Sequence, residues 1–267
     1  MRIIRFLDER GDSRWGVPEE NGQARILVAP PFPEPPRLGH ERAAVSRILA
    51  PVEPSNVYCV GKNYQEHIVE TGSRPPAHPI VFLKPTTAVI GPDASIRIPL
   101  ACRDTPQVDY EGELAVVVGR EARDVSEEDA LHHVLGYACA NDVTARWWQR
   151  HGGGPWARGK GFDGFCPVGP CVVTADEIPD PQSLLLETEL NGVIMQRSAT
   201  SQMLFSVRRL ISFLSQDTTL LPGTLILTGT PAGVGFTRTP PVFMRAGDVV
   251  AVTISGVGRL ENRVEAA

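Results

Sequence analysis

The sequence predicts an α+β protein in which strands dominate, and three observations support this fold class. First, short apolar segments recur along most of the chain, each bounded by Gly, Pro, Asn or Asp, which is typical of strands joined by turns. Second, the 25 glycines and 24 prolines among 267 residues exceed the usual share and favour many turns. Third, helical periodicity is limited to a few segments, so an alternating βαβ series is not expected.

The first fifty or so residues are expected to form a small β-domain. Apolar segments separated by polar turns predict short strands at residues 3–7, 15–17 and 24–28. Residues 29–39 hold so many prolines that they exclude a helix or a central strand. Residues 41–50 are expected to form one short helix, and residues 51–56 a linker. The chain is therefore divided into an N-terminal β-domain, residues 1–52, and a larger domain, residues 53–267.

The larger domain is also expected to be rich in strands. Its apolar segments predict strands at residues 56–61, 79–85, 112–119, 170–175, 184–192, 224–229 and 248–256. A helix is expected over residues 126–141, with Ser126 as its N-cap and apolar residues at Ala130, Val134 and Leu135. A second helix is expected over residues 203–216, where apolar residues near helical spacing are Leu204, Val207, Ile211 and Leu214.

Composition excludes several classes of protein. No apolar run approaches the roughly 20 residues of a membrane span, and the first residues lack the apolar core of a secretory signal. A net charge of −5 without a basic block is unlike a nucleic-acid-binding protein. The five cysteines are scattered and form no C-x-x-C pair, so reduced and buried thiols are expected. We therefore expect a cytoplasmic protein with neither a nucleic-acid nor a membrane partner.

The most informative segment is VDYEGELAVV, residues 108–117. Because alternate residues of a strand share a face, Asp109, Glu111 and Glu113 would point to the same side. Carboxylates this close repel one another unless a cation lies between them, and Mg²⁺, Mn²⁺ and Ca²⁺ prefer oxygen ligands. The segment therefore predicts either a site for a divalent cation or the solvated face of an edge strand.

Asp142, in the segment NDVTAR, is the candidate third ligand. It follows the helix expected over residues 126–141, so its carboxylate is either a metal ligand or a turn or cap residue. The sequence has no H-E-x-x-H motif, and His132 and His133 are adjacent, so a histidine-rich zinc site is not expected.

The segment GKNYQEHIVETG carries a candidate catalytic pair. Asn63 as N-cap, with Glu66 three residues later, predicts the start of a short helix, and Gly72 predicts its end. His67 and Glu70 then share a face, where the carboxylate would orient the imidazole as a general base. The alternative is an ordinary surface pair. A helix this short could also act as a mobile lid.

Two glycine-rich segments contain further candidates. Residues 154–160 match the G-x-x-x-x-G-K spacing of a phosphate loop, but Gly161 stands where such loops carry Ser or Thr, so nucleotide binding is not favoured. Lys160 is interpreted instead as a cation aimed at an anionic substrate, or as a proton donor. In LILTGTPAGVG, backbone N–H groups and Thr230 form either a carboxylate cradle or a tight turn at the end of a strand.

Taken together, the motifs resemble those of the fumarylacetoacetate hydrolase superfamily. The resemblance covers residues 53–267, in order and spacing, through the motifs GKNYQEHIVE, FLKP, DYEGELAVVVG, NDVTAR, RGKGFD and LTGTPAGVG. It implies a β-rich fold of twisted sheets rolled around a metal site, in a homodimer. It implies that Mg²⁺ or Mn²⁺ is held by Glu111, Glu113 and Asp142. It implies a His67–Glu70 dyad on a lid and a catalytic lysine at Lys160. The positions that match substrate-binding residues are Lys84, Arg146, Gln149 and Thr230.

The resemblance also implies a reaction on a small 2-oxo acid. We hypothesise that the acid binds the cation through its carboxylate and 2-oxo oxygen, and that the cation stabilises an enolate. With an acylpyruvate, water activated by His67 would cleave a C–C bond, and Lys160 would stabilise or protonate the developing anion. Decarboxylation of oxaloacetate and isomerisation of a hydroxymuconate-type diacid are the alternatives within the superfamily. A metal-binding homologue without catalysis is the alternative outside this chemistry.

The sequence departs from the common pattern of the superfamily in places. Gly161 and Gly164 stand where many members carry Ser and Thr, and Trp147 stands where Asp is usual. Ala199 and Gln202 stand where Asn and Asp are frequent. Because the metal ligands, the dyad and the lysine all match, an active enzyme is expected. The two glycines and the tryptophan are expected to reshape the pocket and hence to change the substrate.

Overall fold

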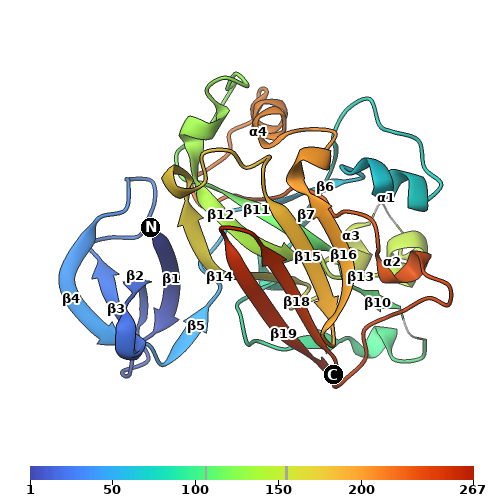
Figure 1. Ribbon diagram of the computed structural model, residues 1–267, viewed down its shortest axis with the longest axis horizontal. Coiled ribbons are helices and arrows are strands. Elements are labelled where there is room, and N and C mark those ends of the chain that lie inside the picture. Colours follow the sequence, from blue (N-terminus) through green and yellow to red (C-terminus); the bar gives the residue numbers. More distant parts are fainter. Residues whose placement is uncertain (106, 154–155) are drawn as a thin grey trace.

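The computed structural model describes residues 1–105, 107–153 and 156–267. Strands dominate it and form a large sheet and a smaller one, with short helices around them (Figure 1). The fold class predicted from the sequence, α+β and mostly β, is therefore confirmed.

The larger sheet contains 12 strands in the described part of the chain. Their bounds are β1 Arg2–Leu7, β2 Ser13–Pro18, β3 Gln23–Leu27, β4 Leu38–Ala44, β5 Arg47–Leu49, β6 Val57–Gly61, β7 Ile80–Lys84, β8 Val89–Ile90, β11 Gly112–Val118, β12 Val134–Asn141, β14 Cys166–Thr174 and β17 Leu225–Leu227. The order across the sheet is β4-β3-β2-β1-β14-β12-β11-β17-β6-β7, while β5 pairs with β1 and β8 pairs with β14.

The smaller sheet and the helices complete the fold. The smaller sheet consists of β9 Ile96–Ile98, β15 Leu185–Leu190, β16 Val193–Ala199, β18 Val249–Ile254 and β19 Gly258–Ala266. Its order is β16-β15-β18-β19-β9. A separate pair consists of β10 Val108–Asp109 and β13 Thr144–Ala145. The helices are α1 Gln65–Glu70, α2 Arg146–His151, α3 Ala157–Lys160 and α4 Val207–Ser215.

Strand β11 lies inside the larger sheet, between β12 and β17, and its seven residues are all buried. Its side chains point alternately into two hydrophobic cores. Leu114 and Val116 pack in the core that also holds Leu186 of the smaller sheet, so the two sheets pack against each other there. Ala115 and Val117 pack in a second core on the opposite face. A strand packed on both faces is a rigid support for the carboxylates at its start.

The prediction of a helix over residues 126–141 is wrong. The segment forms a 3₁₀ turn, Ala130–His133, and then strand β12, whose eight residues are all buried. This strand pairs with β11 on one side and β14 on the other, and a Cβ at Gly136 would lie 2.1 Å from the carbonyl oxygen of Val173. A fully buried strand is continuously apolar, and periodicity alone does not distinguish it from a buried helix.

The helix expected over residues 41–50 is also wrong, because β4 and β5 occupy that segment and pair with β3 and β1. A segment this short has weak intrinsic helicity, so the hydrogen bonds offered by neighbouring strands decide its structure. The helix expected over residues 203–216 is confirmed in part as α4, which begins four residues later than expected, at Val207. Its N-cap is Ser206, whose hydroxyl accepts a hydrogen bond from the Arg209 N–H at 3.2 Å.

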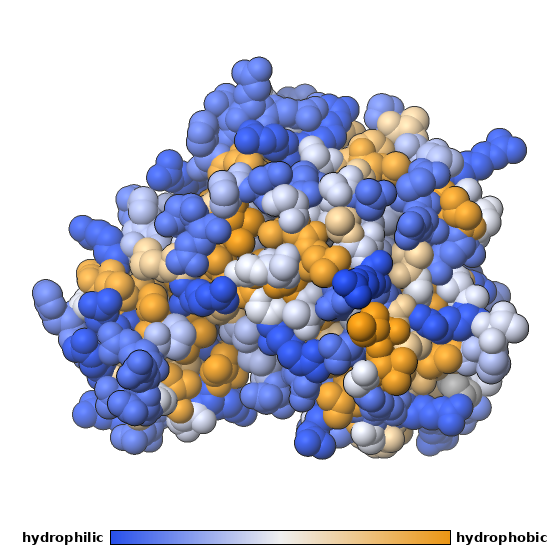
Figure 2. Space-filling model, in the orientation of Figure 1, coloured by the Kyte–Doolittle hydropathy of each residue, from blue (hydrophilic) through white to orange (hydrophobic). Residues whose placement is uncertain are grey.

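The N-terminal strands β1 to β5 form one side of the molecule, drawn in blue in Figure 1. Strand β1 pairs with β14, so these strands extend the larger sheet. The division of the chain at residue 52 stays a prediction. All five cysteines are free and buried. None of the helices in the described ranges is long and apolar enough to cross a membrane. Figure 2 shows hydrophobic patches interspersed among hydrophilic side chains on one face.

Candidate active site

Three carboxylates meet where β11 begins and β12 ends. Glu111 precedes β11, Glu113 lies in it, and Asp142 follows β12. Pairing of Gly112 with Asn141 joins the two strand ends, and the Asp142 N–H donates to the Glu111 carbonyl at 2.8 Å. All three carboxylates are buried, and their candidate ligand atoms lie within 4.8 Å of one another. The structure therefore brings together the three residues that the sequence suggests as metal ligands.

Three cations bind these carboxylates. Lys160, the last residue of α3, donates to Glu111 Oε2 at 2.8 Å and to Asp142 Oδ2 at 2.6 Å. Arg146, the first residue of α2, donates through Nη1 to Glu111 Oε1 at 2.6 Å. Lys84, the last residue of β7, donates to Asp142 Oδ1. Segments that are far apart in the sequence thus converge on one buried cluster of charges.

The cations pair with Glu111 and Asp142, whereas no ion pair among the described residues includes Glu113. Burial raises the pKa of Glu111, but Lys160 and Arg146 outweigh burial and lower this pKa to about 2. Glu113 accepts one hydrogen bond from the described residues, from the Gly229 N–H at 2.6 Å. Burial and the neighbouring carboxylates raise the pKa of Glu113 well above its usual range. Glu113 is therefore the carboxylate whose charge the described residues leave without a cation.

The donor set fits a hard divalent cation. The buried charges of the cluster are those of Asp109, Glu111, Glu113, Asp142, Lys84, Arg146 and Lys160. With all of them ionised, the carboxylates outnumber the cations by one, so the cluster lacks positive charge. Carboxylate oxygens are the ligands that Mg²⁺ and Mn²⁺ prefer. Glu111, Glu113 and Asp142 are the residues that would hold such a cation.

Asp109 is linked to the cluster through Arg146 but lies outside the group of Glu111, Glu113 and Asp142, contrary to the expected alternation along one strand. It ends β10, and β11 begins only at Gly112, so the strand is interrupted between them. Asp109 accepts hydrogen bonds from Arg146 Nε at 2.8 Å and from the backbone N–H groups of Gly235 and Phe236. Its contacts therefore position Arg146. The alternative of a solvated edge strand is also wrong, because β11 is interior and these carboxylates are buried.

His67, which is buried, and Glu70, which is half-buried, form a pair on helix α1. The His67 Nδ1 lies 2.7 Å from Glu70 Oε1, while Glu70 Oε2 accepts hydrogen bonds from the Gly233 N–H at 3.0 Å and the Thr237 hydroxyl at 2.9 Å. Burial raises the pKa of Glu70, but the hydrogen bonds from His67 and Gly233 outweigh burial and lower it. The ionised carboxylate fixes the imidazole and leaves its Nε2 for chemistry. An ordinary surface pair is excluded, because only 8% of His67 is exposed.

Helix α1 begins differently from the expected capping box. Asn63 does not cap it, because its side chain donates to the carbonyls of Phe205 and Thr228 and accepts from the Phe205 N–H. Tyr64 is at the N-cap position without a side-chain hydrogen bond. Gly72 follows the end of the helix with a φ of +61°, as the sequence predicts for a stop. The buried Asn63 thus anchors the start of α1 to two distant segments.

The glycine-rich segment 229–236 binds carboxylates of the protein itself. Backbone N–H groups at its first, fifth and seventh residues donate to Glu113, Glu70 and Asp109. Thr230 donates to the Gly112 carbonyl at 3.0 Å and accepts from Gln196 Nε2 at 2.8 Å. The backbone part of the expected carboxylate cradle is present and holds side chains of the site, whereas the Thr230 hydroxyl donates to a backbone carbonyl instead. The contact between Gln196 and Thr230 could not be predicted from the sequence, because Gln196 lies on a strand, β16, that is remote from Thr230 along the chain.

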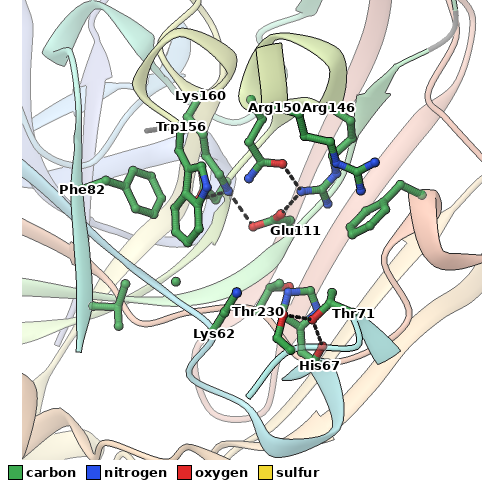
Figure 3. A pocket seen from close by; sticks show the side chains of 16 residues that line it. Lys62, His67, Thr71, Phe82, Glu111, Arg146, Arg150, Trp156, Lys160 and Thr230 are labelled. Atoms are coloured by element: carbon green, nitrogen blue, oxygen red, sulfur yellow. Dashed lines mark hydrogen bonds and ion pairs between the residues drawn. The ribbon is translucent and has the colours of Figure 1, made fainter. Parts of the chain in front are cut away.

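His67 of the dyad and two of the carboxylates, Glu111 and Asp142, line one cavity of about 500 Å³ (Figure 3). The predicted site residues that line it are His67, Glu111, Asp142, Arg146, Gln149, Lys160 and Thr230. Gln149 accepts a hydrogen bond from Arg146 at 3.2 Å. Lys84 and Glu113 lie behind this lining, where Lys84 binds Asp142.

The sequence interpretation missed two cations and three aromatic residues of the lining: Lys62, Arg150, Phe82, Trp156 and Phe236. Arg150 follows Arg146 by four positions, a spacing that places both on one face of a helix, so a signal for it was present. Lys62 lies inside the GKNY motif, next to strand β6. The rings of Phe82 and Trp156 meet edge-on at 5.4 Å between centroids and form one wall. A wall built from two segments that are distant in the sequence cannot be predicted from a local pattern.

The substitutions expected to reshape the pocket do not line it in the described part of the chain. Trp147 lies on α2 with 50% of its surface exposed, and its ring meets the Trp148 ring edge-on and the His151 ring at a tilt. A Cβ at Gly161 would lie 2.8 Å from a backbone carbonyl of α3, and Gly164 has a φ of +77°. Local backbone geometry therefore explains both glycines. Residues 154–155 of the phosphate-loop match lie outside the described residues.

Comparison with known proteins places this chain in a family. A family model described as fumarylacetoacetate (FAA) hydrolase C-terminal matches residues 56–265. The mitochondrial oxaloacetate tautomerase FAHD2A of Bos taurus is 45% identical over 264 residues, which cover 98% of this chain and 79% of the relative.

Solved structures agree with the family match. A 5-carboxymethyl-2-hydroxymuconate delta-isomerase from Mycobacterium smegmatis superposes with a TM-score of 0.87 at 40% identity, covering 100% of both chains. A fumarylpyruvate hydrolase from Pseudomonas aeruginosa, solved with Mn²⁺ and pyruvate, has a TM-score of 0.72 at 34% identity, covering 83% of this chain and 93% of the other. Since the family model spans most of the sequence and both similar structures are enzymes, the chain belongs to the fumarylacetoacetate hydrolase family of enzymes.

Proposed function

We propose that the enzyme cleaves a C–C bond in a small 2-oxo acid of the acylpyruvate or fumarylpyruvate type, through an enolate, with Mg²⁺ or Mn²⁺ as cofactor. The observation that carries this proposal is the convergence of the His67–Glu70 pair, Lys160 and the buried carboxylates on one cavity of about 500 Å³. A cavity of this size suits a small organic acid. Similarity to a fumarylpyruvate hydrolase solved with Mn²⁺ and pyruvate supports the substrate class and the cofactor.

Three carboxylates of the cluster hold the cofactor in this proposal. Bound to Glu111, Glu113 and Asp142, the cation would supply Lewis acidity that stabilises negative charge on a substrate oxygen. Arg146 donates to Glu111, and Lys84 donates to Asp142, so these cations fix the orientation of two ligands. A ligand held in this way loses little further freedom when it binds a metal.

His67 performs the proton chemistry. Glu70 fixes its Nδ1 at 2.7 Å, so Nε2 accepts the proton of a water molecule as the water oxygen adds to the acyl carbonyl carbon. The C–C bond then breaks, and its electron pair stays on the three-carbon fragment as an enolate. Protonation of that enolate at carbon gives pyruvate, and the acyl group leaves as a carboxylic acid.

Lys160 stabilises the anion that develops in this reaction. Burial lowers the pKa of Lys160, but Asp142 and Glu111 outweigh burial and raise it. The amine therefore stays protonated at neutral pH and presents a fixed positive charge to the cavity that it lines. A fixed charge in a buried site stabilises an enolate without costly reorganisation.

A second candidate function is enolate chemistry on a diacid without hydrolysis of a C–C bond. The 45% identity to an oxaloacetate tautomerase favours oxaloacetate, which gives its own enolate when C3 loses a proton and the enolate of pyruvate when carbon dioxide leaves. The 40% identity to a hydroxymuconate isomerase favours a diene diacid of the 2-hydroxyhepta-2,4-diene-1,7-dioate type. In each case the same side chains stabilise an enolate and move a proton, and only the bond that changes differs.

A panel of substrates tests the proposal. Protein loaded with Mn²⁺ is incubated with acetylpyruvate, fumarylpyruvate, oxaloacetate and a hydroxymuconate analogue, and the enol absorbance is followed with and without EDTA, beside His67→Ala. We expect an acylpyruvate to be consumed in a reaction that needs both the cation and His67. Turnover of oxaloacetate or of the diene diacid alone would replace hydrolysis by the second candidate. No turnover in the panel, with the metal bound, would favour a homologue without this catalysis.

We also propose that the enzyme is a cytoplasmic homodimer, without a nucleic-acid or membrane partner. The five free, buried cysteines suit a reducing compartment, where disulfides are rare. Light scattering on the eluted protein checks the assembly. The expected mass is twice that of the 29.0 kDa chain, and a monomer mass would contradict the dimer.

A further inference from the structure

Two cations of the cavity lining have no partner in the carboxylate cluster. The Lys and Arg side chains of the lining are Lys62, Arg146, Arg150 and Lys160. Arg146 and Lys160 are bound to Glu111. Among the described residues, no ion pair includes Lys62 or Arg150. The lining therefore offers two positive charges that the site itself does not neutralise.

Arg150 is supported by an aromatic ring and not by a carboxylate. It lies one helical turn after Arg146 on α2, and both guanidinium groups lie over the ring of Phe236. The distances from the guanidinium carbon to the ring centroid are 4.3 Å for Arg146 and 4.9 Å for Arg150. Contact with a ring face restrains the guanidinium and leaves its N–H donors available at the edge. The guanidinium group of Arg150 is therefore held in place at the cavity, with N–H groups that can donate hydrogen bonds.

Lys62 reaches the same cavity from a different side (Figure 3). Its φ of +56° is uncommon for a residue other than glycine, and such backbone conformations concentrate at functional sites. It follows Gly61, the last residue of β6, so a rigid strand fixes its position. Lys62 adds to the positive field that an anionic substrate meets on entering.

We propose that Arg150 binds a second carboxylate of the substrate, so that the enzyme selects dicarboxylic 2-oxo acids over monocarboxylic ones. This inference rests on the proposed function for the 2-oxo acid class alone. The first carboxylate and the 2-oxo group belong at the reacting end, near Lys160 and the metal ligands. A fork of N–H donors matches the two oxygens of a carboxylate, and such a charge-assisted pair, here from an exposed arginine, changes affinity by about tenfold.

A binding measurement that needs no turnover tests this inference. Calorimetric titration of Mn²⁺-loaded protein compares 2-oxoglutarate with 2-oxopentanoate, which has a methyl group in place of the distal carboxylate. We expect the wild type to bind 2-oxoglutarate about tenfold more tightly. In Arg150→Met the ratio of the two affinities falls to within about twofold, while Arg10→Met, an exposed control in the turn after β1, keeps the wild-type ratio.

The inference is overturned if the wild type shows no preference, or if Arg150→Met keeps the wild-type ratio, including the case where it weakens both ligands equally. Thermal unfolding of each variant confirms that the comparison is made between folded proteins. A preference that depends on Arg150, in a protein that turns over no substrate of the panel, would support this inference and reject the proposed function. Turnover without the preference would do the reverse.

Discussion

Replacing Glu113 by glutamine separates two effects of this carboxylate. In metal-free protein, Glu113 is buried, accepts one hydrogen bond from the Gly229 N–H, and lies beside the Glu111 and Asp142 carboxylates. An amide keeps the hydrogen bond and removes the charge. Removing a buried carboxyl group whose ionised form the fold disfavours is worth about 2 kcal/mol, or about 4–8 °C in melting temperature for a chain of this size. We therefore expect metal-free Glu113→Gln to melt above the wild type at pH 8.

With metal present, the same substitution has the opposite effect. A cation at about 100 times its dissociation constant stabilises the native state by about 2.7 kcal/mol, or about 5–11 °C. Glu113→Gln lacks one of the three carboxylate ligands, so we expect its melting temperature to rise by less than about 2 °C on addition of Mn²⁺. The substitution should therefore raise stability without metal and remove most of the stabilisation by metal.

The pH dependence gives the sign of the first effect independently. Folding raises the pKa of Glu113, since burial and the neighbouring carboxylates disfavour its ionised form. A group of this kind stabilises the fold below its unfolded pKa, about 4.3, and that stability is lost as pH rises through the folded pKa. The melting temperature of metal-free Glu113→Gln minus that of the wild type should therefore increase from pH 5 to pH 8.

Differential scanning fluorimetry in EDTA and in Mn²⁺, at pH 5 to 8, measures all three quantities. Glu265→Gln, an exposed glutamate on β19, is the matched control and should follow the wild type throughout. Equal Mn²⁺ shifts in Glu113→Gln and the wild type would refute the assignment of Glu113 as a metal ligand. A lower melting temperature for the metal-free variant at pH 8 would refute the charge argument.

Three further predictions concern the catalytic pair, the lysine and the aromatic wall. Thr237→Val removes a hydrogen bond to Glu70 and should lower kcat about threefold to tenfold with KM unchanged, while Thr237→Ser keeps the wild-type rate. Lys160→Met should lower kcat at least about 100-fold and keep a Mn²⁺ shift in melting temperature. A Cβ at Gly61 would lie 2.3 Å from the Trp156 ring, so Gly61→Ala should cost about 1–3 kcal/mol of unfolding free energy. Adding Trp156→Ala should recover part of that loss in denaturant titrations, and strictly additive losses would contradict the contact.

The sequence correctly predicts those elements whose formation depends on signals within the segment itself. The strands between Gly and Pro turns are found where they are expected, and so is helix α4, because its apolar stripe and Ser206 cap are local signals. Strand β12 is different, because its eight buried residues are specified by β11 and β14 on either side. No feature of residues 126–141 themselves indicates that β11 and β14 lie on either side of this segment.

The site shows the same division. The alternation of Glu111 and Glu113 is local and is predicted, and the family motifs identify the positions of the other charged residues. The break that turns Asp109 toward Arg146 depends on N–H groups more than 100 positions away, at Gly235 and Phe236. The carboxylate-binding role of the glycine-rich segment is likewise a property of the folded chain, since its partners come from distant segments.

The central claim is that this site stabilises the enolate of a 2-oxo acid, and proton exchange at C3 tests it most directly. An enzyme that protonates the pyruvate enolate must also catalyse the reverse step, so it should exchange the methyl protons of pyruvate for deuterium in D₂O. ¹H NMR of pyruvate with Mn²⁺-loaded protein should show exchange that is lost in EDTA, in Glu113→Gln and in Lys160→Met, and retained in Arg10→Met. Exchange no faster than in buffer, from a protein that binds Mn²⁺ and pyruvate, would contradict the claim.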